Sequence, residues 1–155
     1  MHGKFSPRLV RVAILLTRLL LGLVFVWAAL SKIPRPWELA DEIVRFGLVP
    51  VPVAPVLAIL LIVVELVAGL LLILGLWVRL AARSVVLLLA AFIVALSQAL
   101  LRHLDLTCGC FGGHEPASWW TVARDVGLLL SGIVLLRSLR PRVPAPTSEP
   151  AEQRE

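Results

Sequence analysis

The two cysteines of the chain, Cys108 and Cys110, lie one residue apart in a short polar stretch between two long apolar segments. Thiolate is the reactive form of cysteine, and strained or exposed disulfides have high reduction potentials. Gly109, between the cysteines, removes a side chain from the small ring that a disulfide would close. The pattern therefore favours a redox-active dithiol/disulfide at Cys108 and Cys110.

Two other interpretations of this loop remain open. The cysteines could bind a metal together with His114 and His103, but zinc sites normally space their thiolates by two to four residues, so one intervening residue is a poor match and we expect no metal. They could also be two free thiols in a glycine-rich turn. For the redox interpretation, nearby cations would favour the thiolate. The candidate cations are Lys32, Arg102, His103, His114 and Arg124.

The composition places this loop in a membrane protein. Of 155 residues, 59% are hydrophobic, and the mean hydropathy is +0.95, well above the values of soluble domains. The net charge of +5 does not indicate a nucleic-acid partner, because the arginines lie at the ends of apolar blocks and form no basic stripe interleaved with aromatic residues. The expected partner of the bulk of the chain is the lipid bilayer.

Four apolar segments are long enough to cross that bilayer. Because each span must satisfy its own backbone hydrogen bonds in lipid, we expect helices, and the fold class is an all-α four-helix transmembrane bundle in one domain, residues 1–140. The first span is expected to be an uncleaved anchor. A short amphipathic helix is expected at the interface, from Trp37 to Phe46, and a disordered cytoplasmic tail at 141–155. The expected spans are about 9–30, 53–76, 80–101 and 119–136.

Four spans place both termini on one side of the membrane, and the basic residues are divided unequally between the sides. Positive charge favours the cytoplasm. We therefore expect a multi-pass protein of the inner (plasma) membrane, with cytoplasmic termini and an extracytoplasmic cysteine loop, where disulfides persist. The nine basic residues on the terminal side are Lys4, Arg8, Arg11, Arg79, Arg83, Arg137, Arg140, Arg142 and Arg154; the five on the loop side are Lys32, Arg35, Arg45, Arg102 and Arg124.

Two of the charged residues within the expected spans lie far from either end of the span. Counted from the cytoplasmic ends, Arg18 and Glu65 both lie near the middle of the membrane, where an isolated charge is costly. We expect them to form a buried ion pair or to share a polar ligand; the alternative is a protonated Glu65 hydrogen-bonded to a neighbouring helix. Gly69, one turn after Glu65, allows another helix to approach closely, or is an ordinary packing glycine.

The motifs resemble a known family. The run CGCFG at 108–112, a following tryptophan (Trp119 or Trp120) and Arg124-Asp125 look like the MauE branch of the DoxX-like membrane proteins, as do the other motifs listed next. The resemblance covers about residues 9–137, and Asp125 departs from it because asparagine is expected there. The other motifs are Arg18, Gly22 and Phe25 in a first helix ending at Lys32, and Glu65 with Gly69.

The resemblance implies a four-helix membrane protein tied to methylamine utilisation, which helps to form disulfides in the extracytoplasmic small subunit of methylamine dehydrogenase. It also implies Cys108 and Cys110 as the redox pair. Arg18, Lys32 and Glu65 would be supporting polar residues. Because many relatives occur outside this pathway, the resemblance alone does not assign methylamine metabolism to the chain.

We expect a membrane thiol–disulfide oxidoreductase. Its Cys-x-Cys pair would exchange with a thioredoxin-like protein or a client protein on the outer face. The chain has no second cysteine pair, so a partner must supply one or the pair must meet an acceptor directly. That acceptor would be a membrane quinone near Arg18, Glu65 or the Trp-rich interface. The alternatives are a non-enzymatic scaffold subunit for a redox partner, and a small-molecule or metal transporter that uses Glu65 and Arg18.

Overall fold

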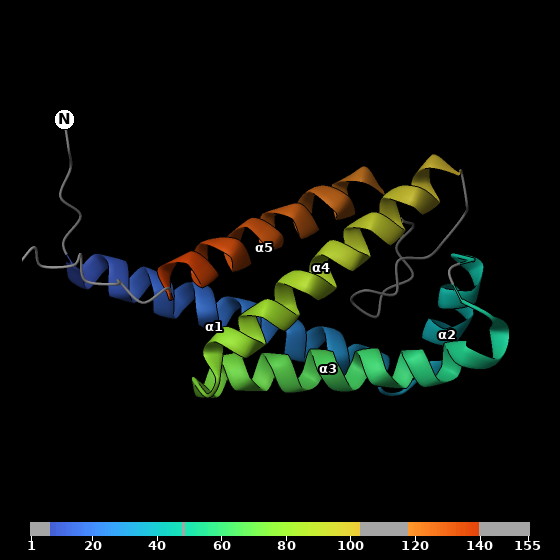
Figure 1. Ribbon diagram of the computed structural model, residues 1–155, viewed down its shortest axis with the longest axis horizontal. Helices are drawn as coiled ribbons and strands as arrows, with labels where there is room; N and C mark the ends of the chain where they lie inside the picture. The colour runs from blue at the N-terminus through green and yellow to red at the C-terminus, as the bar shows by residue number, and fades with distance from the viewer. Residues whose placement is uncertain (1–6, 48, 103–117, 140–155) are drawn as a thin grey trace, which may run out of the picture.

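A computed structural model describes residues 7–47, 49–102 and 118–139, and within these ranges every regular element is a helix. Figure 1 shows long helices lying along one another, with a short helix near one end of the bundle. The expected all-α four-helix bundle is confirmed, as is a helix in the first loop. The expected tail at 141–155 lies outside the described residues. The elements are α1 (Pro7–Lys32), α2 (Pro36–Arg45), the 3-10 helix η1 (Val51–Val53), α3 (Ala54–Leu74), α4 (Val78–Leu101) and α5 (Trp119–Ser138).

The four long helices are each long and apolar enough to cross a membrane. Their bounds differ by at most two residues from the expected spans. Large apolar side chains such as Leu23, Val67 and Leu87 point outward and are 48–70% exposed. Such exposure would be unfavourable in water but is favourable against lipid. The chain is therefore a multi-pass membrane protein.

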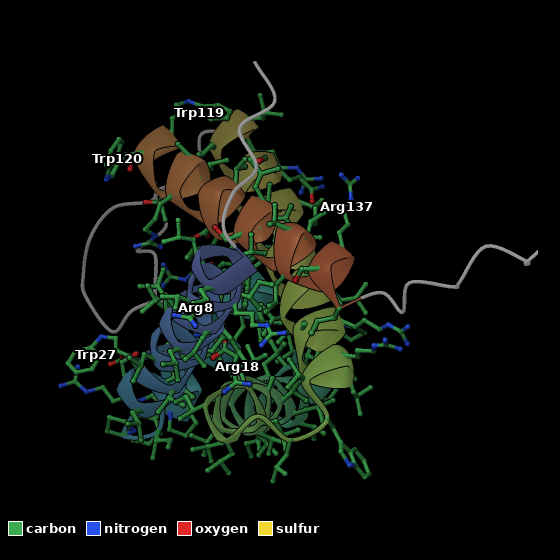
Figure 2. All side chains as sticks on the ribbon, turned by 90° about the vertical axis from the view of Figure 1, so that its left-hand side faces the viewer. Arg8, Arg18, Trp27, Trp119, Trp120 and Arg137 are labelled. Carbon is green, nitrogen blue, oxygen red and sulfur yellow. The ribbon has the colours of Figure 1, made fainter. Side chains whose placement is uncertain are left out.

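The four helices surround a common interior. α1 packs mainly on α3, α4 packs mainly on α5, and contacts of α3 with α4 and of α1 with α5 close the ring. Figure 2 looks along the bundle from the end that holds the start of α1 and the end of α5. We call this the terminal end, and the opposite end, with Lys32, α2, Arg102 and Ser118, the loop end (Figure 1).

Two glycines bring the backbones of α1 and α3 close together. A Cβ atom on Gly22 would lie 2.9 Å from the carbonyl oxygen of Gly69, and one on Gly69 would lie 2.9 Å from the carbonyl oxygen of Gly22. Backbones this close leave no room for a side chain at either position. The interpretation of Gly69 as a point of close helix approach is therefore confirmed, and the contact sets the register between α1 and α3.

A short turn joins α3 to α4 at the terminal end. Gly75 ends α3 with φ +76°, in the left-handed region that favours glycine, and its N–H donates to the carbonyl of Leu71. Near the start of α4, Arg79 donates to the carbonyl of Leu139, just after α5. The turn and this bond hold three helix ends together at the terminal end.

The short helix α2 covers the beginning of α3. Its apolar side, Leu39, Ala40 and Ile43, is buried against a group of small and branched residues, while Trp37 and Glu38 are exposed. Pro36 occupies the first turn, where a missing N–H costs nothing. This amphipathic division matches the pattern expected from the sequence. The residues beneath α2 are Ala29, Ala54, Ala58 and Ile62.

The glycine contact can be tested by adding a single methyl group. Replacing Gly69→Ala places a Cβ 2.9 Å from the backbone N of Val26 as well as from Gly22, and we expect it to lower the free energy of unfolding by about 1–3 kcal/mol. Gly127→Ala is the matched control, because nothing lies within 4 Å of a Cβ there. Thermal unfolding in detergent micelles measures both. Equal melting temperatures for the two variants would contradict the assigned register.

Candidate functional site

The buried face of α1 leads to a charged residue at its end. Leu21, Phe25 and Ala28 follow one another at helical spacing, and Lys32 continues this face with only 6% of its surface exposed. Because side chains on a helix tilt toward its N-terminus, Lys32 points back into the bundle instead of out at the loop end. The last residue of α1 therefore places an ammonium group in the interior.

Glu65 of α3 receives that ammonium group. Lys32 Nζ donates to Glu65 Oε1 at 2.7 Å and to Oε2 at 2.8 Å. Glu65 is 2% exposed, so this is a buried ion pair, and removing either partner would leave an uncompensated charge. Phe92 of α4 adds a cation–π contact, with its ring centroid 5.2 Å from Nζ.

Helix α5 contributes Asp125, which is 3% exposed. Arg124 donates to its Oδ1 from Nε at 3.3 Å and from Nη2 at 3.2 Å. Asp125 lines a cavity of about 30 Å³ together with Lys32, Glu65 and Phe92. A cavity of this size has room for about one water molecule. We call Lys32, Glu65 and Asp125 the buried polar cluster.

The expected ion pair between Arg18 and Glu65 is wrong, because Glu65 is bonded to Lys32. Arg18 instead lies beside the turn after α3, as Figure 2 shows, with Nη1 2.9 Å from the place of a Cβ on Gly75. Gly75 is ten residues beyond Glu65, about 15 Å along the helix. Counting depth from the ends of the apolar segments misplaced Arg18, because α1 starts further out than α3 ends.

Arg18 has a different setting from the buried polar cluster. Its Nε atom is buried and has no hydrogen-bond partner within the described part of the chain. The guanidinium lies at the C-terminal end of α3, where the helix dipole favours a positive charge. The structure therefore separates Arg18 from Lys32 and Glu65, the two other supporting residues expected from the sequence.

The expected redox pair, Cys108 and Cys110, lies outside the described residues, as do His103 and His114. The described chain leaves α4 at Arg102, which is exposed, and resumes at Ser118, which caps α5 by accepting the N–H of Thr121. Both points lie at the loop end (Figure 1). The segment that carries the cysteines is thus anchored at the same end of the bundle as Lys32.

The remaining candidate cations have separate roles. Lys32 forms an ion pair with Glu65, and Arg124 forms one with Asp125. Arg102 is the candidate cation that directly precedes the undescribed segment. Trp119 and Trp120, just after that segment, are exposed by 60% and 80%, as expected of residues at a membrane interface.

Sequence reasoning did not assign Asp125 or Phe92 to this site. A signal for Asp125 was present, since a carboxylate within an apolar span marks a functional residue by default. The sequence interpretation places Asp125 in the family motif and at the interfacial start of the last span, where it departs from an expected asparagine, and not in the site. No sequence signal singles out Phe92 among the apolar residues of α4.

Comparison with known proteins agrees with the resemblance of the motifs. The family described as methylamine utilisation protein MauE matches residues 10–138. The methylamine utilization protein MauE of Paracoccus denitrificans is 34% identical over 137 residues, which cover 86% of this chain and 74% of that protein. No solved structure matches the chain significantly. The matched region includes the whole buried polar cluster.

A double-mutant cycle can measure the ion pair. We expect Lys32→Met and Glu65→Gln each to lower the free energy of unfolding by about 3–5 kcal/mol, because each leaves a buried group without its partner. The double variant should lose much less than the sum of the two. Denaturation in mixed micelles, followed by circular dichroism, gives the three values.

The exposed pair formed by Arg35 and Glu38 is the matched control. These side chains are 56% and 51% exposed, so Glu38→Gln should change stability by less than about 1 kcal/mol. Additive losses for Lys32 and Glu65 would show that the two residues do not act as a pair.

Proposed function

The chain belongs to the MauE family, and we propose that it is a membrane thiol–disulfide redox protein that acts on extracytoplasmic protein disulfides through Cys108 and Cys110. The observation that carries the proposal is where the described chain stops and resumes: Arg102 and Ser118, which border the cysteine segment in the sequence, lie at the same end of the bundle as the buried Lys32. The relative's name ties it to methylamine utilisation. The small subunit of methylamine dehydrogenase is therefore the first client to test.

The distribution of arginines supports a cytoplasmic terminal end. Arg8, Arg79, Arg83 and Arg137 are all exposed at the ends of helices there. Of the basic residues counted on the opposite side, Lys32 is buried against Glu65 and is no loop charge. Without Lys32, the sequence count becomes nine basic residues on the terminal side to four on the loop side, and the cysteine segment would face outward.

The proposed cycle has two balanced steps. A client dithiol attacks the Cys108–Cys110 disulfide through a mixed disulfide, which leaves an oxidised client and two reduced cysteines. A membrane quinone then accepts two electrons and two protons from Cys108 and Cys110, which restores their disulfide and yields the quinol. A thioredoxin-like protein takes the place of the client if it carries the dithiol between them.

Three places were expected for the quinone: near Arg18, near Glu65, or at the Trp-rich interface. Their geometry favours one of them. Arg18 lies beside Gly75 at the terminal end, whereas Arg102 and Ser118, which border the cysteine segment in the sequence, lie at the loop end. The cavity beside Glu65 has about 30 Å³, too little for a quinone ring. The exposed Trp119 and Trp120 flank the cysteine segment and face the membrane interface. We therefore propose that the quinone meets the cysteines there, from the lipid.

The central test is removal of each thiol. We expect Cys108→Ser and Cys110→Ser each to abolish disulfide formation in the client, because either change prevents the Cys-x-Cys disulfide. Alkylation of client thiols, followed by mass spectrometry, measures the reaction in membranes with an added quinone. One of the two single-cysteine variants should also accumulate a mixed disulfide with the client.

Ser97→Ala is the control, since it changes a hydroxyl within α4 and leaves both thiols in place. Thermal unfolding of every variant must match that of the natural chain. If both cysteine variants form client disulfides as the natural chain does, the redox proposal is wrong and a scaffold subunit is favoured. Uptake into liposomes that depends on Glu65 would favour a transporter.

A further inference from the structure

The buried polar cluster carries unequal charge. Lys32 supplies one ammonium group, whereas Glu65 and Asp125 supply two carboxylates, and all three side chains are at least 94% buried. Arg124 adds a positive charge to Asp125, but its side chain is 37% exposed and its two bonds, of 3.2 and 3.3 Å, reach the same oxygen. With Arg124 included, two cations balance two carboxylates, but the buried charge of Asp125 is compensated only by this partly exposed partner, and one bound proton removes that charge.

The hydrogen bonds show which carboxylate can take that proton. Glu65 accepts two short bonds from Lys32, one on each oxygen. Asp125 accepts only on Oδ1, and within the described residues no hydrogen bond reaches its Oδ2. An ammonium group has three donors, so Lys32 retains one N–H beyond the two that bind Glu65. Asp125 is therefore the carboxylate that has an oxygen available to bind a proton or a water molecule.

One cavity is lined by both residues that carry these unused groups. It is lined by Lys32, Glu65 and Asp125, and its volume of about 30 Å³ accommodates one water molecule. A buried water needs two to four polar partners, and the cluster offers an N–H and carboxylate oxygens. The charged groups that face Asp125 are Lys32 from α1, Glu65 from α3 and Arg124 from α5; α4 contributes the uncharged Phe92.

We propose that Lys32, Glu65 and Asp125 form a proton-binding site, in which a water molecule in the shared cavity links Lys32 to Asp125 and Asp125 takes up one proton. Both oxygens of Glu65 accept bonds from Lys32, whereas within the described residues Oδ2 of Asp125 accepts none, so the proton is assigned to Asp125. The site needs no redox partner to bind its proton, and it can be examined in the purified chain.

The role of the site rests on the proposed thiol–disulfide function. Before a quinone can oxidise the dithiol, a cysteine thiol must lose its proton to become the thiolate. Asp125 accepts that proton, so that a thiol and a carboxylate become a thiolate and a carboxylic acid, and the proton passes afterwards to the reduced quinone. Asp125 is seven residues beyond Ser118, about 10 Å from the loop end of α5.

Infrared spectroscopy of the purified full-length chain tests the site directly. Titration with acid should produce the C=O stretch of a buried carboxylic acid, and exchange into D₂O should shift it. Asp125→Asn should remove this band, whereas Asp125→Glu should keep it at a shifted frequency. Asp41→Asn is the control, because Asp41 is exposed on α2. A band that survives Asp125→Asn, or no such band in the natural chain, overturns the proposal.

The kinetic test uses the same variants in quinone-dependent oxidation of the client, measured across a range of pH. Asp125→Asn should slow the reoxidation of the cysteines on the order of 100-fold, the lower range for loss of a proton acceptor, and should abolish the pH limb due to Asp125. Asp125→Glu should restore both. A natural rate and pH profile in Asp125→Asn would overturn the role in the cycle.

The two measurements separate the failure of this inference from that of the proposed function. If the natural chain oxidises no client with quinone, the redox function fails while the infrared band still decides on the proton site. If the chain is active and the band does not depend on Asp125, the proton site alone is wrong. Thermal unfolding is the control for folding. Asp125→Asn preserves the shape of the side chain, so this variant should unfold at the same temperature as the natural chain.

Discussion

The ion pair between Lys32 and Glu65 constrains the whole bundle. Because both groups are buried, neither can turn to water when the other is displaced. Sliding α1 along α3 by one turn, about 5.4 Å, would separate the charges. The contact of Gly22 with Gly69 holds the same register by shape alone. Shape and charge therefore specify one arrangement of α1 on α3, and the other two helices close around the pair that it creates.

Much of the fold follows from the sequence, because lipid leaves few structures open to long apolar segments. The partner of Glu65 does not follow. Arg18 and Lys32 lie fourteen residues apart, close to four helical turns, so both fall on the buried face of α1 and either could meet a carboxylate. The register decides between them, and it depends on how closely two backbones approach at Gly22 and Gly69. That distance is a property of the packed pair of helices.

Asp125 shows a second limit of sequence reasoning. Its neighbour Arg124 is an evident partner, and the pair resembles a polar entrance to a helix at the interface. Only the rotation of α5 within the bundle shows that Asp125 shares a cavity with Lys32 and Glu65. Rotation is fixed by residues such as Leu135 and Gly132, which pack on α4 and carry no sign of the chemistry nearby. The sequence of a single helix therefore does not show which of its residues reach a site that four helices form together.

The division of the bundle into two ends accounts for how one cysteine pair could be sufficient. Disulfide-forming membrane proteins need a path from a client to an electron acceptor, and this chain has only Cys108 and Cys110 to provide it. In the proposed cycle, electrons pass from that pair to an acceptor in the adjacent lipid, and the accompanying protons need polar groups, which the lipid interior does not offer. The cavity shared by Lys32, Glu65 and Asp125 places such groups inside the bundle at the end where the cysteines are anchored. In the proposed cycle, a bundle built in this way supplies the proton-binding site, and the client and the acceptor supply the rest of the redox reaction.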